Sequence, residues 1–375
     1  TLDTPIQSFY PEFRVTDDLR SRTANFRDLL AHRMGIPGHF KPLLAGFPKG
    51  LTRDEFVRSM AHMPTWLSFR GKFRYNNYMY TVAAHVIEKM SNGRTWESLV
   101  KDLLLVPLNM SATGFFVEPG GGEGTGGNHS NHSNHSTVAG DTDKTSYDTT
   151  IPDFASSCAL IGGAPRDVSP DLWLSIIPCG PAGAIYSNAE DMAKWMKFQL
   201  SSGRASTDAS IDLDPSVIRA TWEPSMLAMT PKKDKWRPTD PVSHVTYGYG
   251  LGWVSADYRG FRQVFHTGSY ITHSSRLWLF PDLDVGIFLT VNGPQKNQAK
   301  TKLIQSVMYY AADELLGLPH WFDATSACTE PPAPRWGPSN VPLRNKEKSE
   351  PHGTANPGSL YGGSFNRSLV SHGNQ

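Results

Sequence analysis

The stretch VFHTGSYITHSSRLWLF, residues 264–280, has two short apolar runs on either side of a polar break. Short apolar runs bounded by turn residues are typical of strands buried in a sheet. Turn pairs such as Pro281-Asp282 divide the neighbouring sequence in the same way. The pattern predicts a meander of short strands, with His266-Thr267-Gly268-Ser269 at the end of one of them.

Helical spacing of apolar residues replaces this pattern on both sides of the meander. Thr52 with Glu55, and Ser187 or Asn188, are the expected helix caps. This order predicts an α+β fold in which helices flank an antiparallel sheet. Strands are predicted at 247–257, 261–268, 274–282 and 284–293, and helices at 51–63, 77–93, 95–110, 189–203 and 298–318.

The composition narrows the classes of function. Hydrophobic residues make up 39% of the 375 residues, which suffices for one large domain or two of moderate size. A formal net charge of +1 gives no indication of a nucleic acid or a membrane surface as partner. The sequence holds no apolar run long enough to span a bilayer, and its cysteines form no C-x-x-C pair typical of zinc or redox motifs.

Two stretches lack the apolar residues that a core requires. The segment 119–146 consists largely of Gly, Ser, Asn and His, which predicts a disordered, exposed insert. Proline is abundant after residue 329, which predicts a linker over 323–358 that follows a first domain at 1–322.

N-glycosylation sequons are concentrated in the insert, where Asn-His-Ser occurs three times in tandem. The alternative for this repeat is a metal site formed by His129, His132 and His135. We disfavour it because ordering a flexible loop would consume much of the binding energy, and we expect no metal. The predicted glycosylation sites are Asn109, Asn128, Asn131, Asn134 and Asn366.

Cys158 and Cys179 flank one loop-rich segment. They are compatible with a disulfide or with two buried thiols. The sequons favour the disulfide, since both features belong to secreted proteins.

Tyr75-Asn76-Asn77 directly precedes a predicted helix, and His266-Thr267-Gly268 ends a predicted strand. Each motif alone has an ordinary explanation: a core tyrosine with a helix cap, and a turn or bulge at a glycine. Taken together and in order, they resemble the serine β-lactamase and penicillin-binding-protein family. The sequence looks most like the branch that holds class C β-lactamases, D-alanyl-D-alanine carboxypeptidases and related esterases. Segments 29–38, 73–116, 181–200, 249–253 and 266–268 carry the resemblance.

The resemblance implies a β-lactamase/transpeptidase-like fold with a mostly helical subdomain, and an active site with the edge of the strand at 266–269 as one wall. Gly268 would let substrate lie close to the backbone, while Thr267 and His266 would offer it polar groups. The backbone N–H of Ser269 would be an oxyanion-hole donor, a group whose loss typically costs about 2.7–4 kcal/mol of barrier. His266 replaces the commoner lysine and loses its charge near neutral pH, so we expect it to hold an anionic substrate less firmly.

The resemblance also implies that Tyr75 carries the proton and that Asn77 is a hydrogen-bonding, positioning residue. A tyrosine, with an ordinary pKa of about 10, acts as a base when a nearby ammonium group stabilises its phenolate. The family supplies this group from an S-x-x-K motif, which also holds the nucleophilic serine. The one Ser-x-x-Lys in this sequence, Ser98 to Lys101, follows Tyr75 instead of preceding it, and we interpret it as a coincidence on a helix surface.

These observations predict a fragment or incomplete gene model whose nucleophile is missing and which is inactive as printed. The segment 359–375 resembles the start of a small β module, here truncated. The main hypothesis is a serine hydrolase that cleaves a small ester, amide or peptide through an acyl-enzyme, without a cofactor. The alternative is a catalytically inactive, secreted binding or matrix protein with the same fold.

The sequons favour an extracellular or lumenal location, and they leave open an upstream membrane anchor and the oligomeric state. Because the missing segment would leave an apolar sheet face uncovered, we expect the chain expressed alone to be poorly soluble.

Overall fold

The computed structural model describes residues 1–38, 43, 45–48, 50–116, 154–169, 176–204, 211–227, 244–270, 272–293 and 298–320. The chain divides into two units, Thr1–Pro334 and Arg335–Gln375, and every described residue belongs to the first. The predicted insert, linker and C-terminal module lie outside the described residues, so their boundaries stay predictions.

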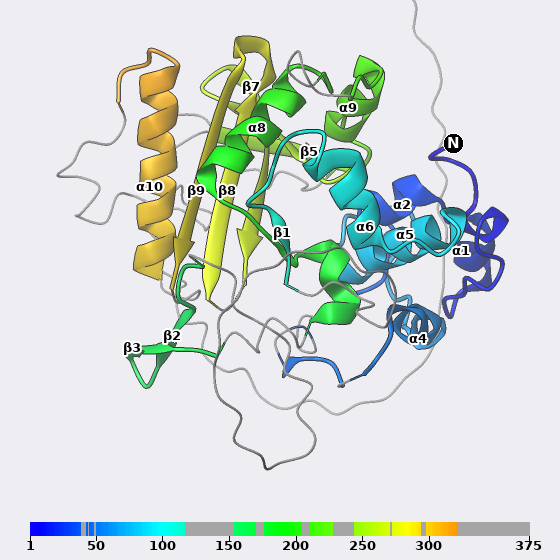
Figure 1. Cartoon of the computed structure of the whole chain (residues 1–375). Helices are drawn as coiled ribbons and strands as arrows, with labels where there is room; N and C mark the ends of the chain where they lie inside the picture. The colour runs from blue at the N-terminus through cyan, green and yellow to red at the C-terminus, as the bar shows by residue number, and fades with distance from the viewer. Residues whose placement is uncertain are drawn as a thin grey trace, which may run out of the picture. The chain divides into compact units, whose positions relative to one another are not determined.

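An antiparallel sheet with the strand order β5-β6-β7-β8-β9 confirms the predicted meander (Figure 1). The predicted strand at 247–257 is two strands, because the chain turns at Gly252, whose φ is 103°. The strands are β5 (His244–Tyr249), β6 (Val254–Tyr258), β7 (Phe261–Ser269), β8 (His273–Phe280) and β9 (Val285–Asn292). Two small pairs join β1 (Gly114–Phe115) to β4 (Ile185–Tyr186) and β2 (Cys158–Ile161) to β3 (Ala164–Asp167).

The predicted helices form, with shorter bounds. Thr52 and Glu55 make the expected capping box, and the side chain of Asn188 caps its helix by accepting a hydrogen bond from the N–H of Asp191. The predicted helix at 95–110 begins as an α-helix and continues as a π-helix, Lys101–Leu105. In the described part of the chain, the α-helices are α1 (Asp18–Thr23), α2 (Phe26–Leu30), α4 (Arg53–Ser59), α5 (Asn77–Met90), α6 (Trp96–Val100), α8 (Ala189–Leu200), α9 (Pro215–Trp222) and α10 (Gln298–Leu315).

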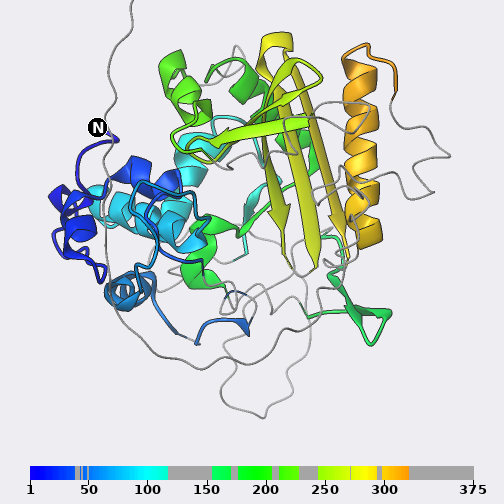
Figure 2. The same cartoon turned by 180° about the vertical axis from the view of Figure 1, so that it is seen from behind.

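Both faces of the sheet pack against helices. Alternate side chains of a strand point to opposite faces, so neighbouring residues of β8 contact different helices. Trp278 of β8 packs with Tyr309 of α10. The next residue, Leu279, lies on the other face, in a cluster with Phe198 of α8. Figures 1 and 2 accordingly show α10 and α8 on opposite sides of the sheet. The expected α+β fold, with helices flanking an antiparallel sheet, is therefore confirmed.

A second core lies among the N-terminal helices, which form the expected helical subdomain. Met79 and Val82 of α5 are fully buried there, in one cluster with Phe13, Leu29 and Phe56. The central helix α5 is therefore fixed by packing on several sides, and so is the segment that leads into it, which contains Tyr75 and Asn76.

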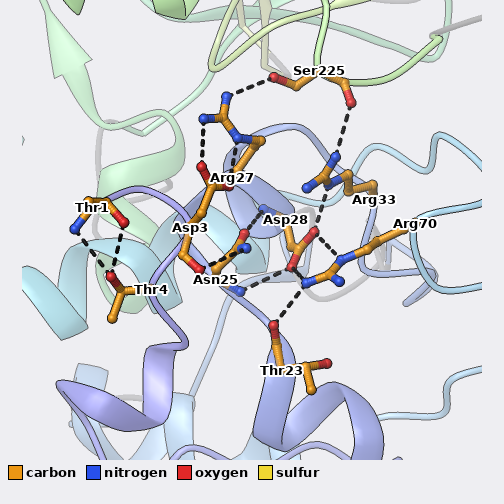
Figure 3. A network of polar contacts seen from close by, with 10 residues as sticks. All are labelled: Thr1, Asp3, Thr4, Thr23, Asn25, Arg27, Asp28, Arg33, Arg70 and Ser225. Carbon is orange, nitrogen blue, oxygen red and sulfur yellow. Dashed lines mark hydrogen bonds and ion pairs between the residues drawn. The ribbon is translucent and has the colours of Figure 1, made fainter.

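A network of ion pairs connects this subdomain to the segment between α9 and β5 (Figure 3). Asp28 of α2 is fully buried, and its carboxylate accepts hydrogen bonds from Arg33 at 2.6 Å and from Arg70 at 2.7 Å. Arg33 also donates to the carbonyl oxygen of Ser225 at 3.3 Å. The turn after α2, which holds His32, is thereby fixed relative to the chain entering the sheet.

Candidate active site

The end of β7 extends beyond the end of its neighbour β6. Pairing of β6 with β7 ends at Val254 and Phe265, whereas β7 continues beside β8 as far as Ser269. Among the described strands, His266 to Gly268 therefore pair with β8 alone. A strand edge of this kind offers backbone hydrogen-bonding groups to a ligand, as the resemblance implied.

The structure shows what a side chain at position 268 would contact, which the sequence did not reveal. Its partner in the register of β7 and β8 is Ser275. A Cβ at position 268 would lie well inside 3.0 Å of the Ser275 Oγ, a separation that real Cβ atoms essentially never show. An alanine here would therefore make the Ser275 hydroxyl rotate away, and close approach of a substrate at this position stays a prediction. The side chains of Thr267 and Ser269 are exposed.

The structure brings Tyr75 and His266 together, although they lie far apart in the sequence. Their ring centroids are 6.3 Å apart, with the planes tilted by 33°. Asn77 is half-buried as the first residue of α5. The cap of α5 is instead Asn76, whose side chain accepts a hydrogen bond from the N–H of Tyr78 at 2.9 Å. The role expected of Asn77 stays a prediction.

His32 lies at the centre of this site and was missed by the sequence reasoning. Its ring centroid is 4.2 Å from that of Tyr75 and 4.9 Å from that of Tyr249, and the residue is 1% exposed. Its Nδ1 accepts a hydrogen bond from the backbone N–H of Asn76 at 3.1 Å. Burial, with a smaller effect of His266, lowers the pKa of His32 to about 3, so the ring is neutral with its proton on Nε2.

Two further tyrosines complete the cluster, Tyr249, which is buried, and Tyr80, which is half-buried, and neither was assigned a role from the sequence. The hydroxyl of Tyr249 lies 3.0 Å from Nε2 of His266. The hydroxyl of Tyr80, on α5, donates to the carbonyl oxygen of Leu30 at 2.8 Å. His32 and Tyr249 belong to segments that carry the family resemblance, which was the available signal for both.

Burial sets the charge state of the two predicted catalytic side chains. It raises the pKa of Tyr75 above its usual value of 10.0 and lowers the pKa of His266 below its usual 6.5. At neutral pH, Tyr75 is therefore a phenol and His266 an uncharged imidazole. The pair can accept, donate and relay protons, but it carries no charge of its own.

Ser98 and Lys101 lie outside this cluster. The Ser98 hydroxyl donates to the carbonyl oxygen of Thr95 at 3.0 Å within the cap of α6, and the side chain of Lys101 is exposed. These positions agree with a coincidence on a helix surface.

The predicted disulfide between Cys158 and Cys179 is wrong, since both are free thiols. Cys179 is buried in the core of the helical subdomain, where burial raises the pKa of its thiol to about 12. Cys158 instead begins the small β2–β3 pair, opposite Asp167. Proximity in a loop-rich sequence did not reveal that one thiol belongs to a packed core.

The other predicted sites stay predictions. Asn109 is exposed, with a left-handed φ of 54°. Of the residues that the structure describes, no three His, Cys, Asp or Glu are grouped so as to hold a metal ion. In the same part of the chain, no helix is long and apolar enough to cross a membrane. Asn128, Asn131, Asn134, Asn366, His129, His132 and His135 lie outside the described residues.

Solved structures share this fold. The chain has a TM-score of 0.57 and 21% identity to the octameric penicillin-binding protein homologue from Pyrococcus abyssi, over 85% of this chain and 60% of that one. For the D-amino acid amidase from Ochrobactrum anthropi SV3, the TM-score is 0.53 and the identity 18%, over 79% and 71% of the two chains.

Curated proteins are similar over most of this chain. It is 26% identical over 315 residues to the unguisins hydrolase ungD of Aspergillus violaceofuscus, which is 80% of this chain and 48% of that protein. It is 22% identical over 313 residues to penicillin-binding protein 4 of Amycolatopsis lactamdurans, 82% and 69% of the two. The chain spans about half the length of the unguisins hydrolases that it matches. The Beta-lactamase family model matches residues 1–311, and the chain belongs to this family.

Proposed function

We propose that this chain is part of a hydrolase that cleaves an ester or amide through an acyl-enzyme, with its reaction centre between Tyr75 and the edge of β7. The observation that carries the proposal is the approach of Tyr75 to His266, 6.3 Å between ring centroids, beside a strand end that extends beyond β6. Membership of the beta-lactamase family supports the reaction class. The curated relative named a hydrolase is consistent with it.

In this proposal a serine oxygen attacks the substrate carbonyl carbon, and Tyr75 relays the serine proton to the leaving group. Water then attacks the acyl-enzyme and releases the acid. In the same proposal, the β7 edge aligns the carbonyl, and the N–H of Ser269 donates a hydrogen bond to the oxyanion. His266, uncharged at neutral pH, would not attract an anionic group, so neutral esters and amides are the favoured substrate class.

The nucleophile and its cation are proposed to come from an S-x-x-K segment outside the printed sequence. The charge state of Tyr75 supports this. Burial raises its pKa, so formation of the phenolate needs a neighbouring positive charge, and the uncharged His266 does not supply one. The lysine of S-x-x-K would provide that charge, and its serine would provide the attacking oxygen.

The second candidate is a catalytically inactive protein that binds a ligand at the same strand edge. One observation favours it: at neutral pH neither Tyr75 nor His266 carries a charge.

Covalent labelling separates the two candidates. The protein is expressed with its contiguous upstream coding sequence, treated with a fluorophosphonate probe and digested for mass spectrometry. Labelling of one serine, followed three residues later by lysine, is the expected result. A folded protein that stays unlabelled would contradict the hydrolase and leave the binding protein.

We also propose an extracellular or lumenal location, which the exposure of the sequon residue Asn109 supports. Removal of N-glycans from the natively produced protein should then lower its apparent mass. Unchanged migration, with no glycan on any sequon peptide, would contradict the proposal.

A further inference from the structure

His32 binds the backbone on both sides of Tyr75. Its carbonyl oxygen accepts a hydrogen bond from the N–H of Arg74 at 2.9 Å, and its Nδ1 accepts one from the N–H of Asn76 at 3.1 Å. The imidazole also packs on the phenol ring of Tyr75, with 4.2 Å between the ring centroids and the planes tilted by 42°. One residue therefore contacts the residue before Tyr75, Tyr75 itself and the residue after it.

The turn that carries His32 holds Asn76 at further points. The side-chain Nδ2 of Asn76 donates to the carbonyl oxygens of Ile36 and Pro37, at 3.3 Å each. The side-chain oxygen of Asn76 accepts from the N–H of Tyr78 and so caps α5. The segment that leads into α5 is thereby attached to the turn after α2, and His32 provides the attachment at Tyr75.

Packing alone does not explain a histidine at this position. The side chain is buried, and within the described part of the chain its Nε2 has no hydrogen-bond partner. An unpaired N–H in a buried site costs free energy, which an apolar side chain would avoid. An apolar side chain would, however, offer no acceptor to the N–H of Asn76, whereas Nδ1 of a neutral imidazole does. Because burial lowers the pKa of His32 to about 3, the ring keeps this acceptor at neutral pH.

We propose that His32 is a positioning residue for Tyr75: by accepting hydrogen bonds from the residues on either side, it holds the phenol where it faces the edge of β7. The role in the reaction rests on the proposed function, in which Tyr75 relays the serine proton. Proton transfer requires hydrogen-bond distance, and a displacement of about 1 Å can slow a reaction about 10²-fold.

Asparagine and leucine at position 32 separate the acceptor from the packing. Both lack the ring and have nearly the same shape, but only the Oδ1 of asparagine can take the place of Nδ1. His32 has a left-handed φ of 56°, which asparagine tolerates better than most residues do. If His32→Leu does not fold, His32→Gln replaces it, because its amide lies one bond farther from the backbone and would not occupy the position of Nδ1.

Amide hydrogen exchange tests the contact without any catalytic activity. The protein is produced with its contiguous upstream coding sequence, and exchange of the Asn76 amide is followed in folded protein. His32→Asn should leave this exchange close to that of the unmodified protein, whereas His32→Leu should make it about 10-fold faster. Equal exchange in the two variants would overturn the proposal, since the acceptor at position 32 would then not hold Asn76.

Acylation by a p-nitrophenyl ester tests the positioning of Tyr75 in the same proteins. His32→Leu should acylate about 10²-fold more slowly at an unchanged half-saturating ester concentration, and His32→Asn should recover most of this loss. His62→Asn, in an exposed histidine of the same subdomain, is the control and should acylate at the unmodified rate. Equal acylation rates in His32→Asn and His32→Leu would overturn the positioning role. If no protein acylates, the unmodified one included, the proposed hydrolase is contradicted, and the exchange of Asn76 still decides whether His32 holds this segment.

Discussion

Replacing Asp28 by Asn tests whether the network of Figure 3 holds the turn with His32 in place. The buried carboxylate accepts hydrogen bonds from Nε of Arg33 at 2.6 Å, from Nε and Nη2 of Arg70 at 2.9 and 2.7 Å, and from the N–H of Asn25 at 3.1 Å. Asparagine has nearly the same size, but it has no charge. Its NH₂ group would also face donors, so two arginines would lose their counter-ion.

Removing one partner of a buried ion pair typically costs about 3–5 kcal/mol. The side chains of Arg33 and Arg70 are 18% and 42% exposed, so water can solvate part of their charge. We therefore expect the lower end, about 3 kcal/mol. At about 2–4 °C per kcal/mol, Tm should fall by roughly 6–12 °C.

Urea unfolding followed by tryptophan fluorescence measures this change. The matched control is Asp102→Asn, because Asp102 pairs with Arg94 on the surface, where both side chains are about half exposed. The control should change the free energy of unfolding by no more than about 0.5 kcal/mol. Equal stability of Asp28→Asn and the control would refute the reasoning, since the arginines would then not depend on Asp28.

The remaining predictions concern pH, the β7 edge and the cysteines. Because burial lowers the pKa of His32 from 6.5 to about 3, its stabilising contribution is complete above pH 6.5. As pH falls from 6.5 toward 3, the unfolded chain binds a proton at His32 that the folded chain does not, so this contribution declines by up to about 1.4 kcal/mol per pH unit. The free energy of unfolding of His32→Gln, measured with urea, should therefore fall less steeply with pH than that of the unmodified chain. Gly268→Ala should cost about 1 kcal/mol in the same assay, because the Ser275 hydroxyl must rotate away, and adding Ser275→Ala should recover most of it. A double variant no more stable than Gly268→Ala would contradict the clash. Iodoacetamide should alkylate Cys158 in the folded protein and Cys179 after denaturation, whereas a disulfide-linked peptide pair would contradict the free thiols.

Elements with a strong local signal could be predicted from the sequence. The capping box of Thr52 and Glu55 and the apolar period of α5 depend on neighbouring residues, and both form as expected. The turn at Gly252 was missed because glycine recurs at every second position of the run YGYGLGW, so no single glycine marks the turn. The π-helix at Lys101–Leu105 was missed because its apolar spacing resembles that of an α-helix.

The site could be predicted only in part. Tyr75 and His266 belong to recognisable motifs, and the structure places them together. The contacts of His32 and Tyr249 arise from the packing of α2, α5 and the sheet, which no local pattern encodes. The pKa directions follow from burial, which is also a tertiary property.

Acylation of the protein that includes the upstream segment tests the proposed reaction centre most directly. Intact mass is followed over time with a p-nitrophenyl ester, for the unmodified protein, Tyr75→Phe and the exposed control Tyr247→Phe. The proposal predicts one added acyl group, formed about 10²–10⁴-fold more slowly in Tyr75→Phe and at an unchanged rate in the control. Acylation that proceeds equally fast in Tyr75→Phe would contradict a reaction centre between Tyr75 and the edge of β7.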